Sequence, residues 1–247
     1  VRKRWYMSWF IDAADPNPTD TAKAASVDLG VRITASLSIE GVAKALHFDG
    51  RELLKDWDYF GLTIAKEQNV IAGTRGILPE NRSPSSGNIS KLYRKRVQRL
   101  EHGLKTMAKA VADACVENGV SVVYLGWPKD IFRDVRYGSS KWAGRIHNFW
   151  SFETSLRFIA AALENVGIAC VRVGERGSSS TCPSCGSKNV VRHPRWKLRC
   201  KDCGEVIHSD QAGSRNILRQ NKPSVGWAGV EATPRTETRR WQRHLWE

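Results

Sequence analysis

Residues 171–218 read VRVGERGSSSTCPSCGSKNVVRHPRWKLRCKDCGEVIHSDQAGSRNIL and hold four cysteines in two C-x-x-C pairs. Cys182 pairs with Cys185, and Cys200 pairs with Cys203, with 14 residues between the pairs. Two short C-x-x-C turns can present four thiolates to one tetrahedral Zn²⁺ ion. A redox-active dithiol, the alternative, would not need the second pair. We therefore expect these four cysteines to bind a structural zinc, because four thiolates leave no open position for a substrate.

The whole chain is basic and has a globular composition. Its 247 residues include 39 Lys and Arg against 25 Asp and Glu, a net charge of +14, with 41% hydrophobic residues. The length suits one large domain, or one medium domain with a small insert. The positive excess indicates an anionic partner, nucleic acid first and an acidic membrane surface second, and the alternative is a solvated basic surface. Cys115 and Cys170 are expected to be small buried residues.

No apolar run reaches the ~18 residues that a membrane span needs, and the N-terminal VRKRWYMSWF does not resemble a secretory signal. We therefore expect no membrane partner and a cytoplasmic location.

Hydrophobic periodicity predicts an alternation of strands and helices around the cysteine-rich segment. Strands are predicted at 4–12, 25–31, 33–39, 42–48, 120–126 and 167–174, and helices at 51–60, 89–118, 141–166 and from Ser209 or Asp210 to 220, with a linker at 15–21, a loop at 72–88 and an irregular tail from 221. Strand–helix–strand units favour parallel pairing with right-handed crossovers. This order predicts an α/β fold of the RNase H-like kind, a mixed five-stranded sheet with flanking helices and an inserted four-Cys zinc ribbon.

The long predicted helix at 89–118 carries a basic face. Its cations are Lys91, Arg94, Lys95, Arg96, Arg99, Lys105 and Lys109. Such a face either contacts nucleic acid or is simply solvated.

Three carboxylates stand at places where such a sheet gathers them. Asp28 lies inside the first strand, Glu175 follows the strand at 167–174, and Asp210 follows the second cysteine pair. Phosphodiester hydrolysis by two divalent ions needs carboxylates that converge from separate elements, and Mg²⁺ prefers such oxygen ligands. Each residue also has an ordinary interpretation: a strand-edge Asp, a surface loop Glu and a helix N-cap.

The segments VDLGVR, VGERGSSSTCPSCG and LRCKDCGEVIHSDQAGSRNIL resemble the RuvC-like nuclease domain of the TnpB (OrfB) proteins encoded by transposons, to which type V CRISPR effectors are similar. The resemblance covers roughly residues 23–220. It implies an RNA-guided DNA endonuclease, with guide RNA and DNA as partners, and assigns Asp28 and Asp210 to the catalytic Mg²⁺ site. Base pairing then carries sequence specificity, and backbone contacts carry affinity.

The resemblance also implies a domain organisation. Residues 1–22 would be the last strand of a preceding wedge-like domain and a linker, and residues 23–176 the first part of the RuvC-like domain. Residues 177–207 would be the zinc ribbon, 208–220 the final RuvC-like helix and 221–247 a C-terminal tail. Independently of the resemblance, Arg215 and other nearby basic residues could contact the DNA strand, and we assign them no catalytic role.

The sequence departs from the family at the middle carboxylate. Many members carry a Glu just after the strand equivalent to 120–126, where this chain has Gly126 and Trp127. Some members instead carry a Glu ahead of the ribbon, which favours Glu175 as the third catalytic residue over Asp130 or Asp134. The family's usual N-terminal half is also missing, so the chain resembles an isolated nuclease domain. The alternatives are a catalytically impaired nucleic-acid-binding protein of this fold, and an RNase H-like nuclease that uses no guide.

Overall fold

The computed structural model describes residues 23–75, 86–127, 152–224 and 237–240. The main sheet contains β1 (Lys23–Leu29), β2 (Ile33–Ile39), β3 (Leu46–Asp49), β4 (Val120–Trp127), β5 (Ala169–Gly174) and β9 (Glu237–Arg240). The helices are α1 (Arg51–Arg75), α2 (Gly87–Glu117), α4 (Phe152–Glu164) and α5 (Ser209–Asn221). A second, smaller sheet contains β6 (Val190–Arg192), β7 (Lys197–Cys200) and β8 (Val206–His208). The predicted strand at 4–12, the linker at 15–21 and the first part of the helix predicted at 141–166 lie outside the described residues.

The main sheet has the strand order β5-β4-β1-β2-β3-β9, so β1 lies at its centre. β1 runs antiparallel to β2 and parallel to β4, and β4 runs parallel to β5. The predicted sheet of five strands, which correspond to β1 to β5, and its mixed pairing are therefore confirmed. The prediction of an irregular tail is wrong at β9, which pairs parallel with β3 as a sixth strand.

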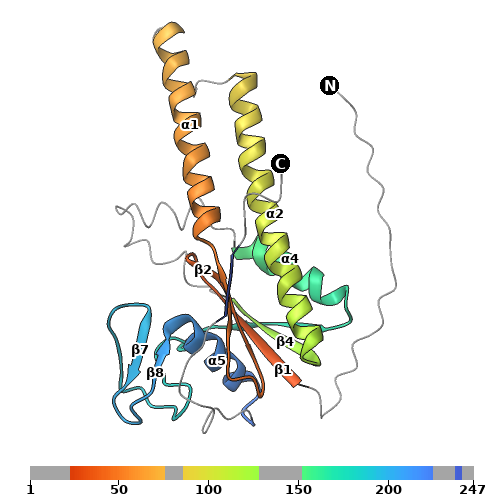
Figure 1. The fold of residues 1–247 in the computed structure, drawn as a ribbon, viewed down its shortest axis with the longest axis vertical. Coiled ribbons are helices and arrows are strands. Elements are labelled where there is room, and N and C mark those ends of the chain that lie inside the picture. The colour runs from red at the N-terminus through yellow and green to blue at the C-terminus, as the bar shows by residue number, and fades with distance from the viewer. Residues whose placement is uncertain (1–22, 76–85, 128–151, 225–236, 241–247) are drawn as a thin grey trace.

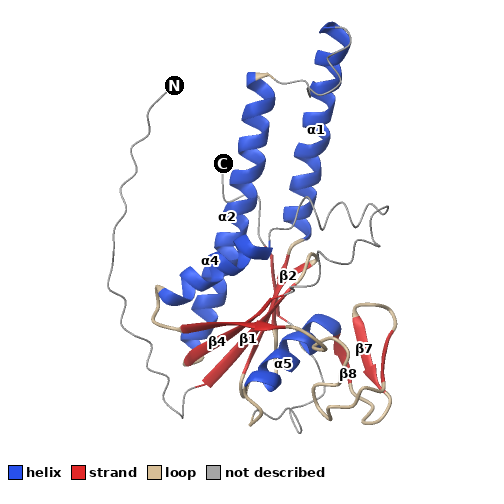
Figure 2. Cartoon of the chain, turned by 180° about the vertical axis from the view of Figure 1, so that it is seen from behind, coloured by secondary structure: helices blue, strands red, loops and turns tan. Residues whose placement is uncertain are grey.

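The two faces of the sheet differ in chemistry because side chains alternate along each strand. Along β1, Ala25, Val27 and Leu29 belong to the main hydrophobic core with residues of α2 and α4. Ser26 and Asp28 point to the opposite face, over which α5 packs. Figures 1 and 2 show this arrangement from front and back, with α5 on the other side of the sheet from α2 and α4.

The core face provides most of the hydrophobic stabilisation. Leu37 of β2, Leu104 of α2 and Leu156 of α4 are at most 1% exposed. Each such side chain contributes roughly 1.5–3 kcal/mol when fully buried. This packing fixes β1, and with it the side chains that β1 presents to α5.

Helices α1 and α2 form a hairpin that rises from the sheet as a tall column (Figure 1). Arg96 of α2 lies over the Trp57 ring at 3.4 Å from its centroid, and Arg99 Nε donates to Asp56 Oδ2 at 2.6 Å. Two cations of the predicted basic face therefore hold the hairpin together. α1 continues to Arg75, although a helix was predicted only over 51–60.

No helix in the described part of the chain combines the length and apolar character that crossing a membrane requires.

Candidate active site

Asp28 lies on the central strand, where it pairs with Ser36 of β2 while the preceding Val27 pairs with Leu125 of β4. Its side chain is half-buried beneath α5 and lies against Gly213. A β-carbon at position 213 would overlap the Asp28 carboxylate, so glycine allows α5 to approach β1 this closely. Such an Asp, set among apolar neighbours, is costly unless another group compensates its charge.

The predicted carboxylates are brought together from three elements that are far apart in the sequence. The pKa of Asp28 is raised well above its usual value, first by burial and then by the negative charges of Glu175 and Asp210. Arg192 of the small sheet acts in the opposite direction on the pKa of Asp28. Carboxylates that lie close together disfavour one another's ionisation, and such groups are typical of sites that bind cations or perform proton chemistry.

Glu175 directly follows β5 and reaches back over the end of β4. Gly174 pairs with Trp127 there, and Glu175 occupies the space in front of Gly126. Burial raises the pKa of Glu175 to about 7, and its buried Oε1 atom has no hydrogen-bond partner. A buried carboxylate oxygen without a donor is available to a cation.

Asp210 lies in the first turn of α5, but it does not cap that helix. The predicted N-cap at Ser209 or Asp210 is wrong, because His208 is the N-cap residue and its Nδ1 accepts the Asp210 N–H at 3.3 Å. The Asp210 side chain is 37% exposed. Its carboxylate is therefore not consumed by capping, which was the ordinary interpretation of this residue.

The three carboxylates are neighbours without forming a closed ligand set. Among the described residues, the four cysteines are the one group of three or more potential ligands gathered tightly enough to hold a metal ion. Mutual repulsion keeps three carboxylates apart, whereas a positive charge placed between them would favour a closer approach.

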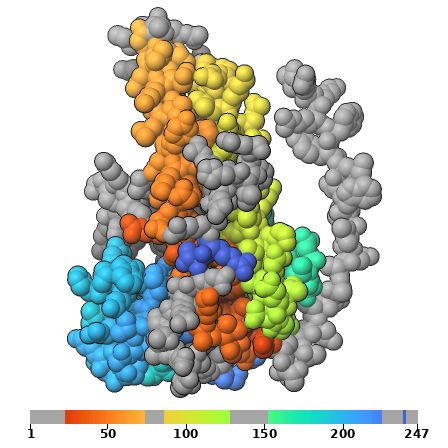
Figure 3. Space-filling model, in the orientation of Figure 1, coloured from red at the N-terminus to blue at the C-terminus, as the bar shows by residue number. Residues whose placement is uncertain are grey.

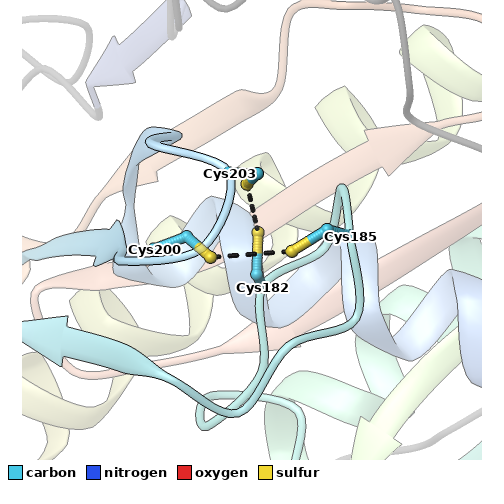
Figure 4. A group of neighbouring side chains, drawn as sticks. All are labelled: Cys182, Cys185, Cys200 and Cys203. Atoms are coloured by element: carbon cyan, nitrogen blue, oxygen red, sulfur yellow. Dashed lines mark hydrogen bonds between the residues drawn. The ribbon is translucent and has the colours of Figure 1, made fainter.

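The four-cysteine group consists of Cys182, Cys185, Cys200 and Cys203, whose sulfurs lie within 4.8 Å of one another (Figure 4). The sulfurs of Cys182 and Cys203 are 3.6 Å apart, as are those of Cys185 and Cys200. Four thiolates at 2.3 Å from a tetrahedral ion would be about 3.8 Å apart. The separations fit a tetrahedral metal site and are too long for disulfide bonds.

The backbone around the cysteines suits thiolates. Burial opposes ionisation of Cys200, but donated N–H bonds from Cys203 and Asp202 outweigh it and lower the Cys200 pKa to about 7. Gly186 and Gly204, which follow the two pairs, have positive φ angles of 77° and 76°. Both turns therefore use a conformation that favours glycine.

Helix α5 connects this ribbon to the main sheet. Asn216 Nδ2 donates to the carbonyls of Ser178 and Thr181 at 2.6 and 2.9 Å, and Arg219 Nη1 donates to that of Pro183 at 3.0 Å. The position of the α5 axis, which carries Asp210, therefore depends on the folded ribbon.

Arg215 has a structural role that contradicts its expected contact with a DNA strand. It is 4% exposed, donates to the Ala43 carbonyl at 2.7 Å and lies 3.7 Å from Glu205. Glu205 in turn accepts a hydrogen bond from Ser184, between the first two cysteines. Arg215 thus links the ribbon to the turn between β2 and β3.

A buried hydroxyl cluster beneath α5 was not predicted from the sequence. Ser26 donates to the Ser214 carbonyl at 2.6 Å, and the Ser214 hydroxyl lies 2.7 Å from that of Ser38 and 3.2 Å from that of Ser36. The signal was present as small polar residues alternating with apolar ones along the first two strands, opposite the core face. Asp130 and Asp134, the weaker candidates for the third carboxylate, lie outside the described residues.

Family comparisons match most of the chain. Residues 10–131 match the model OrfB_IS605, described as a probable transposase, and residues 152–217 match the model of the Cas12f1-like TNB domain. A curated relative is the TnpB-like protein ORF457 of Acidianus two-tailed virus. It is 28% identical over 207 residues, which cover 80% of this chain and 42% of the relative.

Two solved structures share the fold. A Cas12f1–sgRNA–target DNA complex matches with a TM-score of 0.57 and 18% identity, over 84% of this chain and 51% of that one. A CRISPR-Cas12f ternary complex matches with a TM-score of 0.60 and 17% identity, over 88% and 42%. The chain thus spans about half the length, or less, of these relatives.

The predicted RuvC-like α/β fold with a four-cysteine cluster is confirmed by this likeness and by the sheet itself. The two family matches include β1, β4, the ribbon and most of α5, the elements that gather Asp28, Glu175 and Asp210. The chain belongs to the TnpB (OrfB) family of transposase-associated proteins, whose structural relatives are the Cas12f effectors.

Proposed function

We propose that this chain is the nuclease portion of an RNA-guided DNA endonuclease that hydrolyses phosphodiester bonds with two Mg²⁺ ions. One observation carries the proposal. Asp28, Glu175 and Asp210 come from the central strand, an adjacent strand end and the final helix, yet the charges of the last two raise the pKa of the first. Carboxylates converging from separate elements are what two-metal hydrolysis requires.

Each carboxylate has a distinct role in this proposal. Asp28, whose pKa both of the other carboxylates raise, would help to hold both ions. Glu175 and Asp210 would each help to hold one of them, and the partnerless Oε1 of Glu175 fits that task. Bound Mg²⁺ would supply Lewis-acid activation of water and neutralise charge on the scissile phosphate.

Glu175 must be ionised to bind a cation, and its pKa of about 7 places the change near neutrality. Arg192, whose positive charge acts on Asp28, is placed to attract the anionic backbone of the substrate toward the carboxylates.

We assign the four-cysteine site to Zn²⁺ with a structural role. Thiolates are preferred ligands of zinc, and four of them leave no position for substrate. The contacts of Asn216 and Arg219 with the ribbon would then make zinc binding a condition for the correct placement of Asp210.

DNA and a guide RNA are the proposed partners, and the nucleoid of a prokaryotic host is the proposed location. The net charge of +14 supports polyanionic partners, and a structural relative was solved with a guide RNA and target DNA. We assign this chain the cutting step, with sequence specificity residing in guide pairing.

The test is nicking of end-labelled single-stranded DNA with Mg²⁺, using the full chain. Asp28→Asn is expected to abolish nicking and retain DNA binding. Asp113→Asn is the matched control, because the Asp113 side chain is 46% exposed on α2 and pairs with Lys109 on the same helix at 2.9 Å. Nicking that survives Asp28→Asn would refute the assignment. Binding without any nicking in the wild type would favour a nucleic-acid-binding protein that lacks catalysis.

A further inference from the structure

The turn between β6 and β7 presents an exposed aromatic residue next to the first turn of α5. Residues 193–196, HPRW, are all exposed, and Trp196 is 56% exposed. Large aromatic side chains are usually covered because their burial is strongly favourable. The exposure of Trp196 therefore indicates either that a ligand covers the ring or that the ring stabilises the ribbon.

Trp196 is held firmly at the start of α5. The Ser209 N–H donates to the Trp196 carbonyl at 2.8 Å. The indole ring stacks on the His208 imidazole, with 5.9 Å between ring centroids and 29° between planes. His208 in turn contacts the buried His47 edge-on, at 4.9 Å between centroids. The indole is therefore supported from the sheet outward.

The position of Trp196 relative to the carboxylates follows from the same contacts. His208, on which it stacks, caps the helix turn that carries Asp210. Arg192, at the other end of the turn, is close enough to Asp28 to lower its pKa. The Arg192 end of the turn therefore lies near Asp28, and the Trp196 end lies near Asp210. In Figure 3 the ribbon forms a lobe beside the sheet.

The surroundings of Trp196 are cationic. Arg192, Arg195 and Arg199 are all exposed on the same hairpin. Exposed cations next to an aromatic ring form the combination that holds a single nucleic-acid strand, because the cations attract the backbone and the ring stacks on a base. A paired duplex offers no free base face except at its ends.

We infer that Trp196 is a stacking subsite for one unpaired nucleobase, next to the phosphate that the carboxylates receive. The subsite rests on the proposed function, which it deepens by making the substrate a single strand at the point of cutting. It also gives the exposed turn of the ribbon a role beyond binding metal. A purely structural role, in which the indole only packs the ribbon onto His208, is the competing explanation.

The test compares Trp196→Phe with Trp196→Leu. Both keep an apolar group on His208, but only Phe retains an aromatic face. Binding is measured by fluorescence anisotropy without added divalent ions or chelator, so the result does not depend on cutting. The ligands are an oligothymidine of about a dozen residues, an abasic strand of equal length and a blunt duplex. Val191→Ala is the control, since Val191 is an exposed ribbon residue outside the turn.

Trp196→Leu is expected to weaken oligothymidine binding roughly 5- to 100-fold, the range for loss of one base–aromatic stack, while Trp196→Phe and Val191→Ala stay near wild type. The abasic strand should bind wild type and Trp196→Leu equally. Equal oligothymidine affinities for Leu and Phe variants would overturn the subsite, as would an equal loss with the abasic strand or the duplex. If binding behaves as expected but no strand is ever cut, the subsite stands and the proposed nuclease function fails.

Discussion

Glu175 fills the space that a side chain at Gly126 would need: a β-carbon on Gly126 would lie 2.5 Å from Glu175 Oε1 and 2.8 Å from its Cγ. The two residues come from adjacent parallel strand ends, since Gly126 pairs with Val173. A carboxylate can therefore reach the end of β4 from the neighbouring strand. This relationship supports the proposal that Glu175 supplies the carboxylate that many family members carry just after the strand equivalent to β4.

Gly126→Ala is expected to displace the Glu175 carboxylate, because separations of 2.5 Å are sterically forbidden. We expect Mg²⁺-dependent nicking to fall at least tenfold and stability to fall by about 1–3 kcal/mol, the usual cost of overpacking. Gly174→Ala is the control, because no atom lies within 4 Å of a β-carbon there. Initial nicking rates and urea denaturation measure the two effects. Unchanged nicking by Gly126→Ala would remove Glu175 from the site.

Periodicity predicted the core elements because burial imposes it directly. The alternation in β1 and β2 and the apolar stripe of α2 follow from one face meeting the core. β9 was missed because ETRR has no such alternation and becomes a strand only by pairing with β3. The extent of α1 was missed because, among its described side chains beyond position 60, only Ile64 is buried, so the apolar periodicity fades there.

Within the candidate site, the sequence order predicted that these three carboxylates converge, but it did not predict which residues position them. His208 was not predicted as a cap because histidine is not among the preferred N-cap residues. Arg215 was predicted at the surface because arginine is rarely buried, whereas here Glu205 and a carbonyl stabilise it. The burial of Arg215 depends on Ala43, which is distant in sequence, and the cap depends on the direction of the His208 side chain.

The raised pKa of Glu175 predicts a dependence of stability on pH. Its usual value is 4.5 and the folded value is about 7, so between these values the folded state binds more protons than the unfolded state. Stability of the metal-free protein should therefore fall as pH rises from about 4.5 to 7, with no further loss from this group above that. The full effect is below about 3 kcal/mol, because the carboxylate is partly exposed.

Glu175→Gln should remove this loss and make the metal-free protein more stable than wild type at pH 8, with little difference at pH 4.5. Urea denaturation at several pH values, without added divalent ions, measures it. Glu117→Gln is the control, since Glu117 is exposed at the end of α2. If the unfolding free energies of wild type and Glu175→Gln differed by the same amount at all pH values, the pKa of Glu175 would not be raised.

Loss of the ribbon metal is expected to loosen α5. Cys200→Ser should lower zinc content, and the contacts of Asn216 and Arg219 with the ribbon should weaken as it unfolds. Amide hydrogen exchange in residues 209–221 should accelerate roughly tenfold or more, with little change in the core strand β1. Cys170→Ser, at a half-buried cysteine outside the cluster, should leave zinc content and α5 exchange unchanged. Unaltered hydrogen exchange in the zinc-free protein would show that α5, and with it Asp210, does not depend on the ribbon metal.

The hydroxyl cluster beneath α5 should set the rotation of that helix. Ser214→Ala removes the shared partner of Ser36 and Ser38 and leaves two buried hydroxyls to find other acceptors. We expect a loss of about 1–3 kcal/mol in unfolding free energy. Ser90→Ala, on the exposed side of α2, should stay within about 0.5 kcal/mol of wild type.

A structural role of Ser214 alone would change stability and leave the cleavage chemistry intact, so a second measurement is needed. Because Ser214 lies one turn after Asp210 on α5, a rotated helix would carry Asp210 away from Asp28. Ser214→Ala should then raise the Mg²⁺ concentration for half-maximal nicking several-fold at a temperature where the variant remains fully folded. Ser214→Thr, which keeps the hydroxyl, should recover part of that Mg²⁺ sensitivity even if its extra methyl group lowers stability. If the Mg²⁺ dependence were unchanged in Ser214→Ala, the hydroxyl cluster would contribute to stability and not to the position of Asp210.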